Sequence, residues 1–383
     1  MAKKHLMAVV RGSQPRMAEM NFYSYFDDFN TRFLGDKHTG WVVEEAIPKN
    51  IKYIHLPLKP VWGFDPITTF LGPAHAHRSW KHVEGLENYL RDVDVINISD
   101  CFYFYCGQAA KLAKKLNKKL VVIVWQNVPR HLSTYLPPYS FNVKAVLEQA
   151  DLFIARSKKS RDYLLSIGAE ERKVKVIYKG INMSQFTPKE RKRDGKIRIL
   201  YVGQLVKSKG VGELLEAFER LSSEFGNLEL WLLGRSKGEM MEEKIKRLAK
   251  HLPIVLKAQV DYDKLPEICR GADIYCHLSQ DWKYLGLFRG GNDWFPYATM
   301  EAMASGLPIV ATRVGGIPEQ LGEIGNIYVK QKDTDSAYEG LKKMILDKNL
   351  RETVGKVNRE RAQKLFEIIT QAHKTEKAIL DIL

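Results

Sequence analysis

Residues 293–319 read DWFPYATMEAMASGLPIVATRVGGIPE, and this stretch predicts a loop, a helix, a strand and a second turn into a helix. Phe295-Pro296 precedes the run YATMEAMAS, and Gly306 stands where helices commonly end in a left-handed turn. The apolar run PIVAT at 308–312 predicts a buried strand. A helix that begins just beyond a strand presents unpaired N–H groups and a positive dipole end, which together favour a phosphate.

The same alternation of strands and helices covers most of the chain. β-branched runs at 5–10, 93–98, 119–125, 151–155 and 173–178 are separated in several places by helical patterns. The alternation restarts at KIRILYVG and continues through LELWLLG, IVLKAQV, DIYCHLS and LPIVATRV. Continuous apolar strands between helices are typical of parallel sheets that are covered on both faces. The predicted fold class is therefore α/β, with two doubly wound Rossmann-like domains facing each other across a cleft.

The best candidate for a linker is NMSQFTPKERKRDGK, which is polar, charged and interrupted by Pro188. We place the first domain at 1–185 and the second at 186–365. The end of the chain reads as consecutive helices, and we expect its last segment, 366–383, to return to the first domain.

Charge and cysteine content restrict the partners and the compartment. The net charge of +15 indicates an anionic partner, such as a nucleotide diphosphate, a nucleic acid or an acidic membrane surface. No nucleic-acid motif is present, so a nucleic-acid partner rests on charge alone. The four cysteines have no zinc-site spacing and predict buried free thiols in a reducing compartment. We see neither a signal peptide nor a membrane span, and expect a cytoplasmic protein.

The basic run KLAKKLNKKL at 111–120 has two interpretations. Its leucines lie on one face of a helix, which would suit peripheral contact with anionic lipid on the cytoplasmic membrane face. An ordinary helix that packs its leucines on a sheet and exposes its lysines explains the same pattern.

The acids Asp293 and Glu301 flank the start of the predicted helix at 297–305. Glu301 lies about one turn into that helix, which suits a carboxylate that accepts bonds from both ribose hydroxyls of a nucleotide. Asp293, before the turn, would point at whatever is attached beyond the phosphates. An exposed helical Glu and a loop Asp are the structural alternative, and spacing alone favours that alternative.

Other segments favour the nucleotide interpretation. EAMASGLPIVATRVGGIPE, which begins at Glu301, resembles the signature of the retaining glycosyltransferases of family 4, which have the GT-B fold. In that signature another Glu stands eight residues before this one, and here Asp293 takes its place. YVGQLVKSKGVGELLEAFERL, LWLLGRS, VDYDKLPEICRGADIYCHLS and VKVIYKGINMSQFTP are similar to further segments of that family. The resemblance implies that 1–185 is the acceptor-side domain and that 186–365 binds a nucleotide sugar.

The resemblance also implies roles for residues of the second half. Lys209 should neutralise the donor diphosphate, Glu301 should bind ribose, and Asp293 should bind a hydroxyl of the transferred sugar. Gln204 stands where the family commonly has Arg and supplies no charge. The remaining donor-binding candidates are Gly203, Val260 and the backbone around Phe295, Pro296, Tyr297 and Ala298.

The first half departs further from the family. Its glycine-rich loop is replaced by RGSQPRMAEMN, where Gly12 remains and Arg11 and Arg16 are candidates for diphosphate contact. The family often has a His directly after the strand that corresponds to 119–125, and this chain lacks it. Three polar residues are candidates to take its position: Gln126, Asn127 and His131.

An insert at 280–292 separates the strand ending in HLS from Asp293, and it reads equally well as a mobile flap or as a surface loop. The acids of RDVD and DYD are better explained by capping than by metal binding. His75 and His77 lack a third ligand in the sequence. We therefore predict neither a catalytic metal nor a cofactor beyond the nucleotide sugar.

The predicted function is metal-independent transfer of a hexose, with retention, from a UDP- or GDP-linked donor to a glycan or lipid-linked hydroxyl. Two alternatives stay open. One is a catalytically silent protein of the same fold that binds a nucleotide sugar or serves as a subunit, and the other is a basic nucleic-acid-binding protein.

Overall fold

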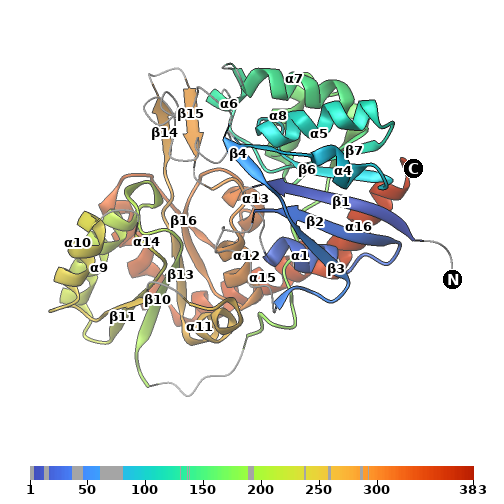
Figure 1. Ribbon diagram of the computed structural model, residues 1–383. Helices are drawn as coiled ribbons and strands as arrows, with labels where there is room; N and C mark the ends of the chain where they lie inside the picture. The colour runs from blue at the N-terminus through green and yellow to red at the C-terminus, as the bar shows by residue number, and fades with distance from the viewer. Residues whose placement is uncertain are drawn as a thin grey trace. The chain divides into compact units, whose positions relative to one another are not determined.

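The computed structural model describes residues 4–12, 17–36, 46–60, 81–129, 131–135, 137, 139–188, 194–236, 239–257, 260–284, 288–291 and 293–383. The chain divides into two compact units (Figure 1). The N-terminal unit comprises Met1–Gly180 and Ile368–Leu383, and the C-terminal unit comprises Ile181–Glu367. The sequence-based boundaries, 185/186 and 365/366, lie a few residues from these.

The N-terminal unit is built on a seven-stranded sheet in the order β3-β2-β1-β6-β7-β8-β9, in which all neighbouring strands are parallel. The strands are β1 (His5–Gly12), β2 (Phe29–Gly35), β3 (Ile51–His55), β6 (Val95–Ser99), β7 (Lys119–Val124), β8 (Leu152–Ala155) and β9 (Val174–Val176). The short strands β4 (Leu58–Pro60) and β5 (Lys81–Val83) pair separately as an antiparallel ribbon.

The helices of this unit lie between its strands in the sequence, except for the last one, which follows the C-terminal unit. They are α1 (Met17–Tyr23), α4 (Leu86–Leu90), α5 (Phe104–Lys115), α6 (Leu132–Tyr135), α7 (Tyr139–Gln149), α8 (Lys158–Ser166), the 3-10 turn η2 (Glu171–Lys173) and α16 (Ile368–Leu380). Figure 1 shows α16, in red, beside the blue strands of this unit. Ala372 and Ile379 of α16 are buried in the same apolar cluster as Met7 and Val9 of β1. The last helix thus completes the core of the N-terminal unit.

The sequence analysis missed β2 and β3. In β2, buried Phe29 and Phe33 alternate with exposed Asn30 and part-buried Arg32, and β3 at the sheet edge is only partly buried. The polar positions interrupt the continuous apolar run that identified the inner strands.

The C-terminal unit has a six-stranded sheet in the order β12-β11-β10-β13-β16-β17, also parallel throughout. Its strands are β10 (Ile197–Val202), β11 (Leu228–Leu233), β12 (Ile254–Lys257), β13 (Ile274–His277), β16 (Ile309–Thr312) and β17 (Ile327–Val329). Its helices are η3 (Lys207–Lys209), α9 (Val211–Glu224), α10 (Glu239–Leu248), η4 (Tyr262–Lys264), α11 (Leu265–Gly271), α12 (Tyr297–Ala304), α13 (Ile317–Leu321), α14 (Thr334–Leu346) and α15 (Lys348–Phe366).

Helical spacing of apolar residues explains how α9 packs on this sheet. Leu214, Leu215, Phe218 and Leu221 repeat every three or four residues and are fully buried in the core of the unit. Each such side chain contributes about 1.5–3 kcal/mol through burial.

The helix and the strand predicted for residues 293–319 are α12 and β16. Gly306 has a φ of 73°, as expected for a left-handed helix end.

The insert at 280–292 contains a two-stranded antiparallel hairpin of β14 (Asp281–Tyr284) and β15 (Phe288–Gly291). All four cysteines are buried free thiols, as predicted. Within the described residues, no helix is long and apolar enough to cross a membrane.

Candidate functional site

Three neighbouring strands of the C-terminal unit end at one edge of its sheet. The strand order places β13 between β10 and β16, so the loops that follow them meet at the carboxyl edge. In open α/β sheets this edge is where ligands bind. Lys209 comes from the loop after β10, Ser279 from the loop after β13, and Gly315 from the loop after β16.

Asp293 is the centre of a buried polar network at this edge, and its side chain is 8% exposed. Its Oδ1 atom accepts a bond of 2.6 Å from Lys209 Nζ. Its Oδ2 atom lies 2.8 Å from His277 Nε2 and accepts a bond from Ser279 Oγ. The Nδ1 atom of His277 is 3.0 Å from the hydroxyl of Tyr275. Both carboxylate oxygens of Asp293 are therefore engaged inside the unit.

The charge state of Asp293 follows from these contacts. Burial alone would raise the pKa of Asp293, since it disfavours the charged form. Electrostatic interactions and hydrogen bonds with His277 and Lys209 outweigh burial and hold the pKa of Asp293 well below its ordinary value. Asp293 is thus an anion throughout the physiological pH range and pairs with Lys209.

Glycines allow the loops around Asp293 to approach one another. Gly315 has a φ of 53°, and a Cβ atom there would lie 1.8 Å from the carbonyl oxygen of Asp293. Gly210, directly after Lys209, has a φ of 69°, and its Cβ would lie 2.1 Å from the Leu278 carbonyl oxygen. Neither position can hold a side chain without moving backbone, so the geometry of the site depends on both.

Glu301 lies in α12 and is 3% exposed. Its neighbour is Tyr262 of η4, a residue that the sequence analysis did not single out. Partial burial of the Tyr262 hydroxyl, the negative charge of Glu301 and a hydrogen bond between the two raise the pKa of Tyr262 well above its ordinary value. Val260, a sequence candidate, is part-buried and two residues before Tyr262. The structure thus brings Tyr262 beside Glu301.

α12 begins directly after Phe295-Pro296, where the sequence predicted a helix start. Pro296 is the N-cap residue and makes no side-chain capping bond. Its carbonyl oxygen accepts a hydrogen bond of 2.9 Å from Gln320 Nε2. This bond fixes the backbone where the helix begins. Phe295 is 2% exposed, and its ring packs edge-on against Phe366 at 5.7 Å. Tyr297 and Ala298 form the first turn of α12.

Gly203 and Gln204 follow directly after β10. The Gly203 N–H donates a hydrogen bond of 2.9 Å to the Leu233 carbonyl oxygen. The Gln204 carbonyl oxygen accepts a hydrogen bond of 2.7 Å from the Tyr201 hydroxyl. The Gln204 side chain is part-buried.

One candidate of the N-terminal unit is corrected by the structure. Arg11 is 1% exposed, and its guanidinium bonds Glu19, Tyr23 and Asn97 inside the unit. Arg11 lies near the end of β1, and its side chain points into the core, where Glu19 neutralises it, and not toward a ligand. We do not carry Arg11 forward as a diphosphate contact.

The other N-terminal candidates lie near the ends of the strands or outside the described residues. Gly12 has a φ of 50° and faces the ring of Tyr105. Gln126 and Asn127 follow β7 and are buried, and His131 is part-buried with its ring 6.4 Å from that of Phe102. Arg16, His75 and His77 lie outside the described residues.

Asp100, at the end of β6, was not predicted from the sequence. Its Oδ1 atom accepts the N–H groups of Trp125 and Gln126, at 2.9 and 3.0 Å. Burial raises the pKa of Asp100 to about 6, although these two bonds act in the opposite direction. Asp100 therefore fixes the backbone that leads to Gln126 and Asn127.

The acids of RDVD have structural partners. Asp92 pairs with Arg32 at 2.6 Å, and Asp94 accepts the N–H of Leu6 at 2.8 Å. Their contacts agree with a structural role in the sheet.

Two family models match adjoining parts of the chain, which together run from residue 47 to residue 361. The model for glycosyl transferases group 1 matches residues 182–361, and the model for glycosyltransferase family 4 matches residues 47–185. The chain belongs to glycosyltransferase family 4.

Individual proteins are similar over shorter stretches. Sulfoquinovosyl transferase SQD2 of Arabidopsis thaliana is 25% identical over 296 residues, which is 71% of this chain and 53% of that protein. An uncharacterized glycosyltransferase of Methanocaldococcus jannaschii is 27% identical over 223 residues, 55% of this chain and 54% of that protein. The matches span about half the length of these curated relatives.

The crystal structure of Anabaena HepE with UDP and glucose has a TM-score of 0.74 to this chain at 18% identity. The superposition covers 98% of this chain and 99% of that one. Anabaena HepE has also been solved with UDP-glucose. This likeness shows the fold, the GT-B arrangement of two parallel α/β units.

Proposed function

We propose that this protein transfers a hexose from a nucleotide-diphosphate sugar to an acceptor hydroxyl with retention of configuration. The observation that carries the proposal is the buried contact between Lys209 Nζ and Asp293 Oδ1 at the carboxyl edge of the C-terminal sheet. It places a cation and a carboxylate side by side near the start of α12, where a donor needs a phosphate contact and a sugar contact. Family membership supports the same chemistry.

Lys209 and the first N–H groups of α12 bind the donor diphosphate in this proposal. A helix N-terminus favours negative charge, and an ammonium group adds a full charge to it. Gln204 adds a neutral hydrogen bond at most, so Lys209 carries most of the charge neutralisation from side chains. Charge accumulates on the diphosphate as the bond to the sugar breaks, and a fixed cation stabilises that charge.

Glu301 binds the ribose in this proposal. Its carboxylate is held in α12 beside Tyr262, and two acceptor oxygens match two neighbouring ribose hydroxyls. Asp293 binds a hydroxyl of the transferred hexose, while His277 and Ser279 hold its carboxylate in place.

No protein nucleophile is assigned. The acceptor oxygen attacks the anomeric carbon from the face that the diphosphate leaves, and the acceptor proton passes to a departing phosphate oxygen. The protein supplies orientation and charge stabilisation. We propose that the acceptor, a glycan or a lipid-linked sugar, is bound by the N-terminal unit, with Gln126, Asn127 and His131 as candidate contacts.

A second candidate is a protein that binds a nucleotide sugar without transferring it. Its support is that both Asp293 oxygens are already bonded within the unit, so binding a sugar hydroxyl requires Asp293 to exchange or share a partner. Asp is also one methylene shorter than the Glu of the resembled signature.

The test begins with melting temperatures in the presence of UDP, GDP and ADP and their glucose, galactose, mannose and N-acetylglucosamine conjugates. A ligand that binds the folded protein raises its melting temperature by mass action. UDP is the first nucleotide to try, because the similar Anabaena protein was solved with UDP-glucose. Release of free nucleotide from the stabilising donor, followed by NMR of the product anomer, then separates transfer with retention from binding alone. If no nucleotide stabilises the protein, the proposed donor site is wrong.

A further inference from the structure

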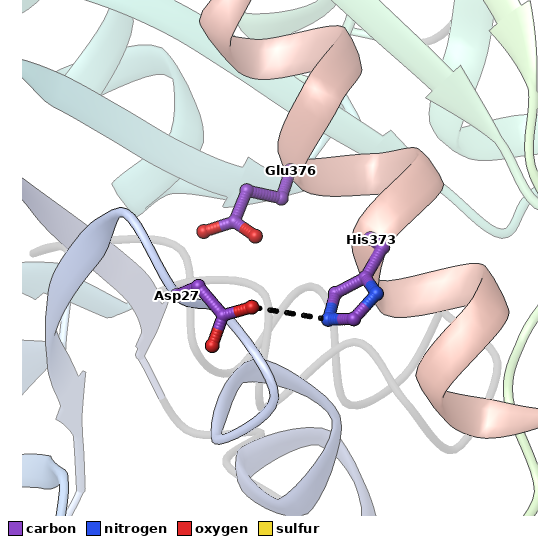
Figure 2. Close-up of side chains that lie close together, drawn as sticks. All are labelled: Asp27, His373 and Glu376. Atoms are coloured by element: carbon purple, nitrogen blue, oxygen red, sulfur yellow. Dashed lines mark ion pairs between the residues drawn. The ribbon is translucent and has the colours of Figure 1, made fainter.

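Three side chains of the N-terminal unit converge on one point outside the candidate donor site. Asp27 comes from the turn between α1 and β2, and His373 and Glu376 come from α16. One potential ligand atom from each lies within 4.8 Å of the other two. Figure 2 shows the two carboxylates and the imidazole directed toward a common space.

The local structure explains this convergence. His373 and Glu376 are three residues apart, so they lie on the same face of α16. The N–H of Asp28 donates a hydrogen bond of 2.7 Å to Glu376 Oε1 and thereby holds the turn before β2 against α16. The adjacent face of α16 is fixed by Ala372 and Ile379 in the core. The three side chains thus project from anchored backbone.

Charge makes the position unusual. Glu376 is 5% exposed, and among the residues that the structure describes no Lys, Arg or His side chain forms an ion pair with it. A buried carboxylate is costly unless opposite charge or hydrogen bonds compensate it, and one backbone N–H is a modest compensation. Asp27 adds a second negative charge nearby. A bound cation would neutralise both.

The distance between Asp27 and His373 also fits a shared metal ion. His373 Nε2 and Asp27 Oδ2 are 3.4 Å apart, and the line between them is drawn in Figure 2. A charge-assisted hydrogen bond is shorter, about 2.7–2.9 Å. Two ligands of a tetrahedral zinc ion with bonds of about 2.0–2.1 Å are separated by about 3.4 Å.

We propose that Asp27, His373 and Glu376 bind a zinc ion, with water as the fourth ligand. One imidazole and two carboxylates form a donor set that zinc accepts. The ion has no part in sugar transfer. It joins α16 to the turn before β2, and so fastens the last helix of the chain to the N-terminal sheet.

The experiment uses the full chain, freed of metal by chelator and dialysis. Zinc affinity is measured by competition with a chromophoric chelator, and cobalt is added separately to record its visible absorption. The variants Asp27→Asn, His373→Gln and Glu376→Gln keep shape while removing one ligand each. The wild type is expected to bind one zinc ion, and each variant should bind zinc at least about tenfold more weakly. Mutation of a residue that only hydrogen-bonds to a metal ligand already lowers metal affinity by about this factor. Zinc should raise the melting temperature of the wild type more than that of any variant.

The matched control is His5→Gln. His5 Nδ1 lies 3.8 Å from Asp94 Oδ2 in the same unit, a partly exposed pair of histidine and aspartate that is not part of the Asp27–His373–Glu376 cluster. This variant should bind zinc and cobalt as the wild type does. Equal zinc affinity in the wild type and the three ligand variants would show that Asp27 and His373 form only an ion pair, and would overturn the proposal. So would an equal loss in His5→Gln.

Discussion

Lys209 and Asp293 are 84 residues apart in the sequence, and their side chains form a buried salt bridge of 2.6 Å. This bridge joins the loop after β10 to the loop before α12. A donor diphosphate that binds Lys209 must compete with or extend this bridge. In the proposed function, the pair therefore couples donor binding to the internal stability of the C-terminal unit.

The first prediction concerns Lys209→Ala. Loss of a hydrogen bond from a charged group costs about 1.5–3 kcal/mol, so the Kd for UDP should rise about 10- to 100-fold. Isothermal titration calorimetry measures the change. Lys207→Ala is the matched control, because Lys207 is exposed in the same short helix and its removal should leave the Kd unchanged. An equal loss in both variants would mean that only general positive charge matters.

Glu301→Gln should separate ribose binding from phosphate binding. The amide keeps the size of the side chain but loses charge and one acceptor, so UDP affinity should fall by about tenfold. Inorganic pyrophosphate has no ribose, and its affinity should be unaffected in Glu301→Gln but reduced in Lys209→Ala. A parallel loss of both ligands in Glu301→Gln would argue for a general disturbance of α12.

The contrast between Lys209 and Arg11 shows what the sequence could predict. The segment YVGQLVKSKGVGELLEAFERL predicted a loop followed by a helix, which is α9, and the structure brings Lys209, just before α9, to Asp293. Arg11 follows the predicted strand at 5–10 but lies within β1 in the structure, and whether its side chain faces a ligand or the core depends on a buried partner. That partner, Glu19, belongs to α1 and is visible only in the folded unit.

The same limit explains the site residues that sequence analysis missed. His277 and Ser279 lie in the quoted run DIYCHLS, yet nothing in the run says that they bond Asp293. Tyr262 of η4 lies beside Glu301 of α12, and Asp100 holds the backbone at Gln126. Inner strands were predictable from apolar continuity, whereas side-chain convergence between distant segments depends on packing.

Asp293→Asn tests the charge balance of the network. Removing one partner of a buried ion pair leaves the other charge unmatched, and should lower the free energy of unfolding by about 3 kcal/mol at pH 7. The pKa of Asp293 in the folded protein is below its ordinary value. Its stabilisation is therefore complete above the ordinary Asp pKa of about 4 and is lost as the pH falls further.

Urea unfolding at a series of pH values measures this effect. The difference between wild type and Asp293→Asn should be constant from pH 8 to about pH 5 and shrink below about pH 4. Asp261→Asn is the control, since Asp261 forms an exposed pair with Lys264 at 3.3 Å and should change stability by less than about 1 kcal/mol. A pH-independent difference would contradict the assigned ionisation.

Gly315→Ala tests whether the turn after β16 positions Asp293. The added Cβ would meet the Asp293 carbonyl at 1.8 Å, and the backbone has a φ of 53°. The variant should melt at a lower temperature and bind UDP more weakly, because the loop must move. Gly212→Ala is the matched control: it lies in α9 with no atom within 4 Å of the added Cβ, and should gain about 0.5–1 kcal/mol. Unchanged UDP affinity in Gly315→Ala would show that this turn does not position the site.

Asp100→Asn should stabilise the protein at neutral pH, which is the opposite of Asp293→Asn. Burial raises the pKa of Asp100 to about 6, so the folded protein disfavours its charged form. The resulting destabilisation is complete above about pH 6 and disappears as the pH falls toward about 4, the ordinary pKa of Asp.

The Asn side chain of this variant keeps the oxygen that accepts the Trp125 and Gln126 N–H groups, and it tolerates the φ of 55° at this position. The gain should reach about 2–3 kcal/mol at pH 7–8 and vanish near pH 4, as measured by urea unfolding. Asp162→Asn is the control at an exposed position and should change stability by less than about 1 kcal/mol at pH 8. A loss of stability in Asp100→Asn at pH 8 would mean that the charge itself holds the segment at Gln126.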